Sequence, residues 1–398
     1  MKDAARPTTT DGCLIDAQAA AAMLRVSLST LYTYVSRQRL GRVVDPATGR
    51  SAFNAAEVAA LHERTNRGRR PDRVALASLD FGWAVLPTSI STIKDGALFY
   101  RGRDAIALSR NADLETIAAL LWDSPPNRAI PDGPDDVQPS DEPPEFEVAL
   151  MSWLGRQAAL HRNVGAWTPR MARPHAWRIL RNALAIATGR WDVDQPSHVS
   201  LARLLGLDIT GQSLLRMALV LHADHELNTS AFTARCTAST AANPYSAVVA
   251  ALCATMGGRH ANFTGARALI EAHGRGDVTG VAELTNFPGF AHKLYPAGDP
   301  RAICLLAVMR DIPEMSATVA DIDKLAAAIE VAHGLRPKND FAMAALEIAY
   351  GLPADTARTI FLISRLVGWL AHVIEQYGSP SLIRPRASYF ELHCDRLT

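Results

Sequence analysis

The feature that most constrains this chain is a long apolar stretch, Thr356 to Gln376, which contains the run TIFLISRLVGWLAHVI. Its apolar side chains recur at helical spacing, so we expect one long helix. Arg365 lies in the middle of this helix, and burying a charge without a partner is costly. The sequence therefore predicts that Arg365 pairs either with a carboxylate of the protein or with an anionic substrate.

The chain upstream of this helix is rich in Ala and Leu, with few β-branched runs. Three further stretches show helical apolar spacing, and Pro and Gly separate them. They are Val199 to Leu207, Gln212 to His225 and Ile322 to Val331. The sequence thus predicts a mainly α body with short irregular elements.

Two segments depart from this Ala- and Leu-rich helical pattern. The Arg-rich segment from Glu63 to Arg73 also contains Gly and Pro, which predicts an exposed linker. The segment from Ser124 to Glu147 is rich in Pro and Asp, and neither helices nor strands tolerate that density of proline. We expect it to be a long surface loop.

The composition sets the broad class of the protein. Its 398 residues suit one large domain or two to three ordinary ones, and 41 basic residues almost balance 40 acidic ones. The five cysteines are scattered without a CxxC pair, which favours reduced thiols over disulfides or a zinc site. The first residues have no apolar signal region, and no uncharged stretch of membrane-spanning length is present. We therefore expect a cytoplasmic protein.

The N-terminal part has a different charge from the rest. Residues 1–75 carry twelve basic and seven acidic side chains, a net charge of +5, which leaves −4 for the remainder. Residues 16–40 split into two short helical patterns, for which Asp16 and Ser29 are the expected N-caps. A turn within residues 46–49 follows, and a further short helix is expected from Asn54.

This order of helix, tight turn, helix and basic hairpin resembles the winged helix-turn-helix of excisionase-type DNA-binding domains. The resemblance implies DNA contact through residues 16–60, because Arg and hydroxyl side chains of the second helix can reach phosphates and base edges. The alternative is a small dimerisation or regulatory cap that keeps the shape without the DNA contact. The candidate side chains are Thr30, Tyr32, Thr33, Ser36, Arg37 and Arg39.

Two histidines, His222 and His225, stand three residues apart and are expected to share a helix face. Together with Asp224 and Glu226 they could suggest a metal site. The spacing is not that of HExxH, however, and no third ligand cluster lies nearby, so we expect no metal. The alternative is a pair of buried, hydrogen-bonded histidines at a helix end.

Three later segments contain further candidates for chemistry. His260 lies in the glycine-rich break GGRHANFT, where the backbone can approach a ligand. His292 and Arg301 lie in the loop FPGFAHKLYPAGDPRA, and loops held by rigid helices often contain functional residues. Asp340 is expected to open a helix, whose dipole stabilises a carboxylate. Taken singly, these residues could also belong to a turn, a solvated loop and an N-cap.

In their order along the chain, these segments resemble citrate synthase from about Phe81 to Tyr389, roughly three quarters of the sequence. The segments that carry the resemblance are PTSISTIKDGALFYRGRDAIAL, HADHELN, GFAHKLYPAGDPRA, the helix of Asp340, SRLVGWLAH and RPR. The resemblance implies a large helical domain of residues 76–258 and 347–398 and a small helical domain of residues 259–346. Residues 1–75 would precede both as the helix-turn-helix module and linker.

The resemblance also implies a reaction, the condensation of acetyl-CoA with oxaloacetate to citrate and CoA, without a permanently bound cofactor. Asp340 would be the general base, His260 would stabilise the enol, and His292 would polarise the ketone. The residues implied to hold the substrate carboxylates are His225, Arg301, Arg365 and Arg384. The family lends the first Arg of RPR, here Arg384, to the neighbouring subunit, so a homodimer is implied.

The CoA half of the site departs from the family pattern. The common sequence GPLHGGAN is replaced by GGRHANFT, so that Ala261 and Asn262 stand where two glycines let CoA approach. Side chains there could narrow the thioester site or shift His260. Pro296 replaces a basic residue that helps hold the CoA phosphate, and Lys293 is expected to compensate.

A further departure, Lys338-Asn339-Asp340 in place of Asn-Val-Asp, is expected to be mild. Three hypotheses then remain for the whole chain. It could be a citrate synthase, a 2-methylcitrate synthase that uses propionyl-CoA, or a catalytically weak DNA-binding sensor of oxaloacetate or citrate.

Overall fold

The computed structural model describes residues 14–24, 26–37, 40–44, 49, 51–55, 57–59, 61, 86–125, 145–162, 165–190, 195–258, 260–276 and 287–387. Its contacts divide the chain into two units, with boundaries between Leu86 and Pro87 and between Arg386 and Ala387. The predicted linker at residues 63–73, most of the turn at residues 46–49 and most of the predicted loop at residues 124–147 lie outside the described residues.

The N-terminal unit contains short helices and a small sheet around a core that includes Leu24, Leu31 and Phe53. The antiparallel sheet has the order β1-β3-β2. Its elements are β1 (Leu14–Asp16), α1 (Ala17–Leu24), α2 (Leu28–Ser36), β2 (Val43–Val44) and β3 (Ser51–Asn54).

The predicted caps of these helices are right in one case and wrong in the other. Asp16 accepts a hydrogen bond from the backbone N–H of Ala19 at 2.7 Å, as an N-cap does. The second helix is capped by Ser27 and not by Ser29. Ser27 has an extended backbone and accepts from the N–H of Thr30, whereas Ser29 already lies within the first helical turn.

The second unit begins with a small antiparallel sheet formed by β4 (Ser91–Lys94), β5 (Ala97–Tyr100) and β6 (Arg103–Asp104), in that order. Thirteen α-helices are described after it, which confirms the predicted mainly α class. They are α5 (Ala105–Asn111), α6 (Leu114–Trp122), α7 (Phe146–Leu160), α8 (Pro169–Thr188), α9 (Ser197–Leu204), α10 (Ile209–Leu221), α11 (Thr229–Ser239), α12 (Pro244–Thr255), α13 (Phe263–Gly274), α14 (Pro300–Arg310), α15 (Ser316–His333), α16 (Asn339–Ala349) and α17 (Thr356–Tyr377).

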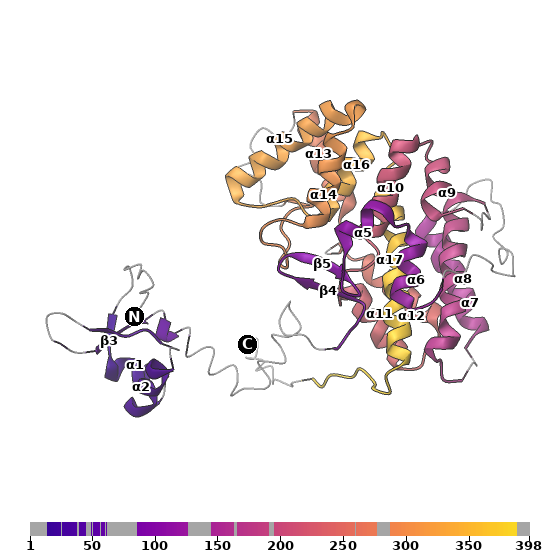
Figure 1. The fold of residues 1–398 in the computed structure, drawn as a ribbon. Helices are drawn as coiled ribbons and strands as arrows, with labels where there is room; N and C mark the ends of the chain where they lie inside the picture. The colour runs from indigo at the N-terminus through magenta and orange to yellow at the C-terminus, as the bar shows by residue number, and fades with distance from the viewer. Residues whose placement is uncertain are drawn as a thin grey trace, which may run out of the picture. The chain divides into compact units, whose positions relative to one another are not determined.

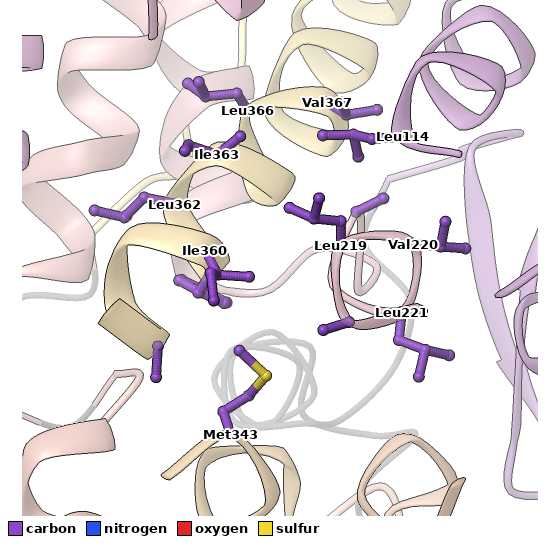
Figure 2. Packing of buried hydrophobic residues seen from close by; sticks show 14 of the residues in the cluster. Leu114, Leu219, Val220, Leu221, Met343, Ile360, Leu362, Ile363, Leu366 and Val367 are labelled. Atoms are coloured by element: carbon purple, nitrogen blue, oxygen red, sulfur yellow. The ribbon is translucent and has the colours of Figure 1, made fainter. Parts of the chain in front are cut away.

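The C-terminal helix α17 is the centre of this unit, in contact with α6, α8, α10, α11, α12 and α16 (Figure 1). Ile363 and Leu366 of α17 and Leu219 of α10 belong to the same buried apolar core (Figure 2). The helix is long and apolar enough to cross a membrane, but 89% of its most apolar window is buried inside this fold. The predicted long helix is therefore confirmed, and it is a buried core helix of this unit.

Helices α13, α14, α15 and α16 pack on one another and form one end of the second unit (Figure 1). Helices α13, α14 and α15 lie within the predicted small domain, residues 259–346, and α16 begins inside it and ends three residues beyond it, at Ala349. The division of the body into a large and a small domain at these boundaries stays a prediction.

Candidate active site

The loop after α10 holds the first candidate histidines, and one prediction about it is wrong. The helix ends at Leu221, with His222 as its C-cap, so His222 and His225 do not share a helix face. His222 is fully buried, and its Nδ1 lies at hydrogen-bond distance from the carbonyl of Ala218. Burial and the nearby Arg301 lower the pKa of His222 to about 3. For His222 this fits the alternative that the sequence left open, a buried, hydrogen-bonded histidine at a helix end.

His225 lies beyond the helix end and is 7% exposed. Its Nε2 lies 3.0 Å from the hydroxyl of Tyr295. The ring centroids of His225 and His292 are 5.1 Å apart, and those of His292 and Tyr295 are 5.0 Å apart. Two histidines from distant segments of the sequence therefore meet around one buried tyrosine, whose role the sequence did not reveal.

His292 has a defined hydrogen-bonding direction. Its Nδ1 accepts the backbone N–H of Leu294 at 3.2 Å, so a neutral imidazole must carry its proton on Nε2. Burial and the charge of Arg301 lower the pKa of His292 to about 4. At neutral pH the ring is therefore a neutral donor through Nε2.

Arg301 lies at the start of α14 and is held by its own N-cap. Asp299 accepts the backbone N–H of Arg301 at 3.0 Å, and its carboxylate oxygens accept Nε at 3.0 Å and Nη2 at 2.7 Å. Burial alone would lower the pKa of Arg301, but the Asp299 carboxylate raises it above its ordinary value. Nη1 makes no hydrogen bond with a described residue, so one edge of the guanidinium is left for another ligand.

Arg365 is 3% exposed, and its Nε has no hydrogen-bond partner among the described residues. Its guanidinium lies 4.9 Å from the ring centroid of Phe361, and it forms no ion pair within the described part of the chain. Burial lowers the pKa of Arg365 to about 10. The sequence left two possible partners for Arg365, a carboxylate of the protein and an anionic substrate. The described residues do not supply the carboxylate.

The carboxylate whose charge acts on Arg365, Asp224, makes its own hydrogen bonds elsewhere. It is fully buried, accepts the hydroxyl of Ser91, and lies 3.3 Å from Nε2 of His372. Burial alone would raise the pKa of Asp224, but His372 and Arg365 hold it below its ordinary value. Asp224 thus contributes to the field around Arg365 without contacting it.

His260 precedes α13 and joins a hydrogen-bonded group around Ser230. Its Nε2 lies 3.0 Å from the Ser230 hydroxyl oxygen, which also accepts Nε1–H of Trp369 at 3.0 Å. The Oδ1 of Asn228 lies 2.7 Å from the same hydroxyl. Burial and the charge of Arg365 lower the pKa of His260 to about 4, so the imidazole is neutral at neutral pH.

The two family glycines after His260 are replaced in structurally different ways. Ala261 adopts the left-handed region with φ of 54°, a conformation that a glycine takes without strain. Asn262 caps α13, because its Oδ1 accepts the backbone N–H of Gly265 at 3.0 Å. Its own backbone N–H donates to Oδ2 of Asp340 at 3.2 Å.

Asp340 lies in the first turn of α16, as predicted, and is 8% exposed. The ammonium of Lys338 lies 3.1 Å from its Oδ2. The charge of Asp340 also acts on the imidazoles of His260 and His292. The three residues predicted to perform the chemistry are therefore close enough to influence one another.

Two predicted site residues are not brought to this cluster. Arg384 lies on the exposed segment after α17 and makes no ion pair with a described residue. Lys293 is exposed on the loop beside His292. The cluster formed within one chain thus contains six of the predicted residues, namely His225, His260, His292, Arg301, Arg365 and Asp340.

Sequence reasoning missed the residues that hold these side chains in place, namely Ser230, Asn262, Tyr295 and Lys338. Tyr295 lies inside the predicted loop, and it could have been found as the only tyrosine of that segment. Ser230 gave no signal, because nothing local connects it with His260, thirty residues away. Within the described residues, no group of three or more His, Cys, Asp or Glu is placed to hold a metal ion.

Known proteins resemble this chain over most of its length. Citrate synthase 2 of Bacillus subtilis is 28% identical over 358 residues, which cover 77% of this chain and 94% of that protein. The 2-methylcitrate synthase 2 of Corynebacterium glutamicum is 31% identical over 43% of this chain and 48% of its own length.

The fold is also that of solved citrate synthases. A ternary complex of the Thermoplasma acidophilum enzyme with carboxymethyl coenzyme A and oxaloacetate superimposes with a TM-score of 0.60 at 22% identity. That match covers 81% of this chain and 97% of the other. The family model of the citrate synthase C-terminal domain matches residues 158–386, more than half of the sequence. The chain belongs to the citrate synthase family.

Proposed function

We propose that this protein condenses acetyl-CoA with oxaloacetate and releases citrate and CoA. The observation that carries the proposal is Arg365, a buried guanidinium without a described carboxylate partner, in the electrostatic field of His225 and Arg301. Such a group is expected to bind an anion, because an unpaired buried charge is otherwise costly. A substrate with two carboxylates matches the two arginines.

The oxaloacetate half of the reaction uses the cluster around Tyr295. Arg365 and the free edge of Arg301 are proposed to bind the carboxylates, and His225 to add a hydrogen bond. His292 donates through Nε2 to the ketone oxygen, since its Nδ1 is occupied by the N–H of Leu294. This polarises the ketone carbon that the nucleophile attacks.

In the acyl half, Asp340 is proposed to remove a methyl proton from acetyl-CoA, and His260 to hydrogen-bond the thioester oxygen on which the negative charge develops. In the structure the Ser230 hydroxyl donates its single proton to Oδ1 of Asn228, so the Ser230 oxygen accepts from Nε2–H of His260. Donation from Nδ1 of His260 to the thioester oxygen therefore requires that the Ser230 hydroxyl turns from Asn228 to Nε2 when the substrate binds. The carbon nucleophile attacks the ketone, and water then cleaves the citryl thioester. Lys293 is proposed to hold a phosphate of CoA.

Release of CoA tests this function directly. We expect the full-length protein to release CoA thiol from acetyl-CoA only when oxaloacetate is present. Propionyl-CoA in a parallel assay distinguishes a 2-methylcitrate synthase, which would turn over propionyl-CoA with the higher kcat/KM. No release from either thioester would overturn the proposal.

We further propose a homodimer in which Arg384 completes the active site of the neighbouring subunit. Its exposure, without an ion pair to a described residue, fits a residue that acts outside its own chain. Closed twofold dimers are the commonest soluble assemblies.

A second function is proposed for the N-terminal unit, which is binding of duplex DNA through a winged helix-turn-helix. The observation in favour is α2, preceded by α1 and followed by the β2–β3 pair, with Tyr32, Thr33, Ser36 and Arg37 exposed on it. Arg42, just before β2, is also exposed. This places hydroxyl and guanidinium groups where such domains contact phosphates and bases.

Arg37→Glu in the full-length protein is expected to weaken DNA retardation at least about tenfold at low salt, because a phosphate contact becomes a repulsion. Arg170→Glu on the exposed start of α8 is the charge-matched control and should leave retardation unchanged. Retardation would be measured with genomic fragments, with and without oxaloacetate. Equal loss in both variants would mean a non-specific charge effect and would contradict the proposal.

A further inference from the structure

Lys338 is fixed immediately before α16, beside the proposed base. It is the N-cap residue of that helix, and its backbone N–H donates to the carbonyl of Gly289 at 2.8 Å. Its side chain is only 26% exposed, and that of Asp340 is 11% exposed. This ion pair is therefore largely covered, unlike a solvated surface pair, which contributes little.

The two groups that bind Asp340 use the same carboxylate oxygen. The ammonium of Lys338 lies 3.1 Å from Oδ2, and the backbone N–H of Asn262 donates to Oδ2 at 3.2 Å. No described residue donates a hydrogen bond to Oδ1. Both contacts thus hold the carboxylate at Oδ2, and Oδ1 is left to accept the proton of the substrate.

The same ammonium acts on both catalytic histidines. The pKa values of His260 and His292 are each lowered to about 4. Burial is the largest cause and a neighbouring arginine comes next, and the positive charge of Lys338 is a smaller cause that acts in the same direction. A cation placed here disfavours imidazolium at both positions. It therefore supports the neutral form in which each ring donates one hydrogen bond to substrate.

We propose that Lys338 is a positioning residue of the condensation, one that presents Oδ1 of Asp340 to the acyl methyl group and remains as the counter-charge when the negative charge moves. The inference rests on the proposed function. When Oδ1 takes the methyl proton, Asp340 becomes neutral and the C–H electron pair passes to the thioester oxygen as an enolate. Lys338 neither gains nor loses a proton. Before the proton transfer, its ammonium stabilises the negative charge on Asp340. After the transfer, it stabilises the negative charge that has moved to the thioester oxygen, which His260 binds.

This assigns a role to a position that departs from the family's Asn-Val-Asp pattern. A neutral Asn there could donate a hydrogen bond but could not supply a charge. A lysine can offset the less favourable surroundings of His260, where Ala261 and Asn262 replace glycines. The substitution is then part of the site and not the mild change that the sequence alone suggested.

The test compares Lys338→Met, which keeps the length without the charge, with Lys338→Arg, which keeps the charge. Lys338→Met is expected to lower kcat about tenfold to a hundredfold while the KM for oxaloacetate stays within about twofold. Lys338→Arg should recover most of kcat. The acid limb of the kcat/KM profile should move to higher pH in Lys338→Met, because the histidines lose a nearby positive charge. Lys324→Met, at an exposed lysine of α15, is the matched control.

Wild-type kcat in Lys338→Met with an unchanged pH profile would overturn the inference, and so would equal damage in Lys338→Arg. Failure of the proposed function gives a different result, because the wild-type protein itself would then release no CoA. In that case, NMR titration of the histidine ring protons still decides the electrostatic part. Higher pKa values for His260 and His292 in Lys338→Met would support it, and unchanged values would refute it.

Discussion

Asp340→Asn is expected to lower kcat for CoA release by about 10²–10⁴-fold, the usual contribution of a general base. The amide has nearly the shape of the carboxylate but cannot accept the methyl proton. Oxaloacetate binding should stay within about twofold, because the proposed carboxylate ligands are on α14 and α17. Calorimetric titration with oxaloacetate would measure binding, and release of CoA thiol would measure turnover.

The matched control for this variant is Asp208→Asn. Asp208 caps α10 through Gly211, and asparagine caps a helix equally well, so turnover should not change. Turnover near the wild-type rate in Asp340→Asn would remove Asp340 from the role of base.

The same variant tests the dimer when it is mixed with Arg384→Ala. In a dimer that shares Arg384 across the interface, a hybrid of the two variants has one site with both defects and one site with none. Random exchange of subunits should therefore restore about a quarter of the wild-type activity. If no activity returns although hybrids form, Arg384 does not act across the interface.

Arg365→Met is expected to have two opposite effects, a loss of oxaloacetate binding and a gain in stability. Without its guanidinium the site loses the proposed anchor of one carboxylate, so kcat/KM for oxaloacetate should fall at least about a hundredfold. The free energy of unfolding without ligand should rise by about 1 kcal/mol, because an apolar side chain of similar volume replaces an unpaired buried charge. The loss of a cation near Asp224 limits this gain, although Asp224 keeps His372 and Ser91.

The variant for comparison is Arg181→Met, which removes another buried arginine of the same unit. Arg181 is 3% exposed and lies 3.6 Å from Oε1 of Glu115, so its removal leaves a buried carboxylate without its cation. We expect this variant to lose about 3–5 kcal/mol. Chemical denaturation of both variants, with and without oxaloacetate, gives the comparison.

The ligand-dependent part of this measurement is independent of turnover. Oxaloacetate at a hundred times its Kd should stabilise the wild type by about 2.7 kcal/mol and should stabilise Arg365→Met hardly at all. A stability loss in Arg365→Met like that in Arg181→Met would mean that Arg365 is paired within the protein.

The local parts of the fold could be predicted from the sequence. Helical spacing located α9, α10, α15 and α17, although α10 ends four residues earlier than the predicted His225. The ends are less predictable because the chain leaves a helix where tertiary contacts replace the helical hydrogen bonds. At this end, the hydroxyl of Tyr100 accepts the N–H of Asp224 beyond the last turn.

The sequence by itself predicted that the body is helical and that Arg365 needs an anionic partner, and its resemblance to citrate synthase supplied eight candidate site residues, six of which the structure brings together. Those conclusions depend on periodicity, on the cost of burying charge, and on motifs that remain together along the chain. Only the tertiary structure decided how the side chains are held. It brought Ser230 to His260, Tyr295 to His225, and Lys338 and Asn262 to one oxygen of Asp340. Lys338 and Asp340 are two residues apart at the start of α16. The other contacts join separate helices and loops, and no local pattern encodes them because each depends on how the helices pack.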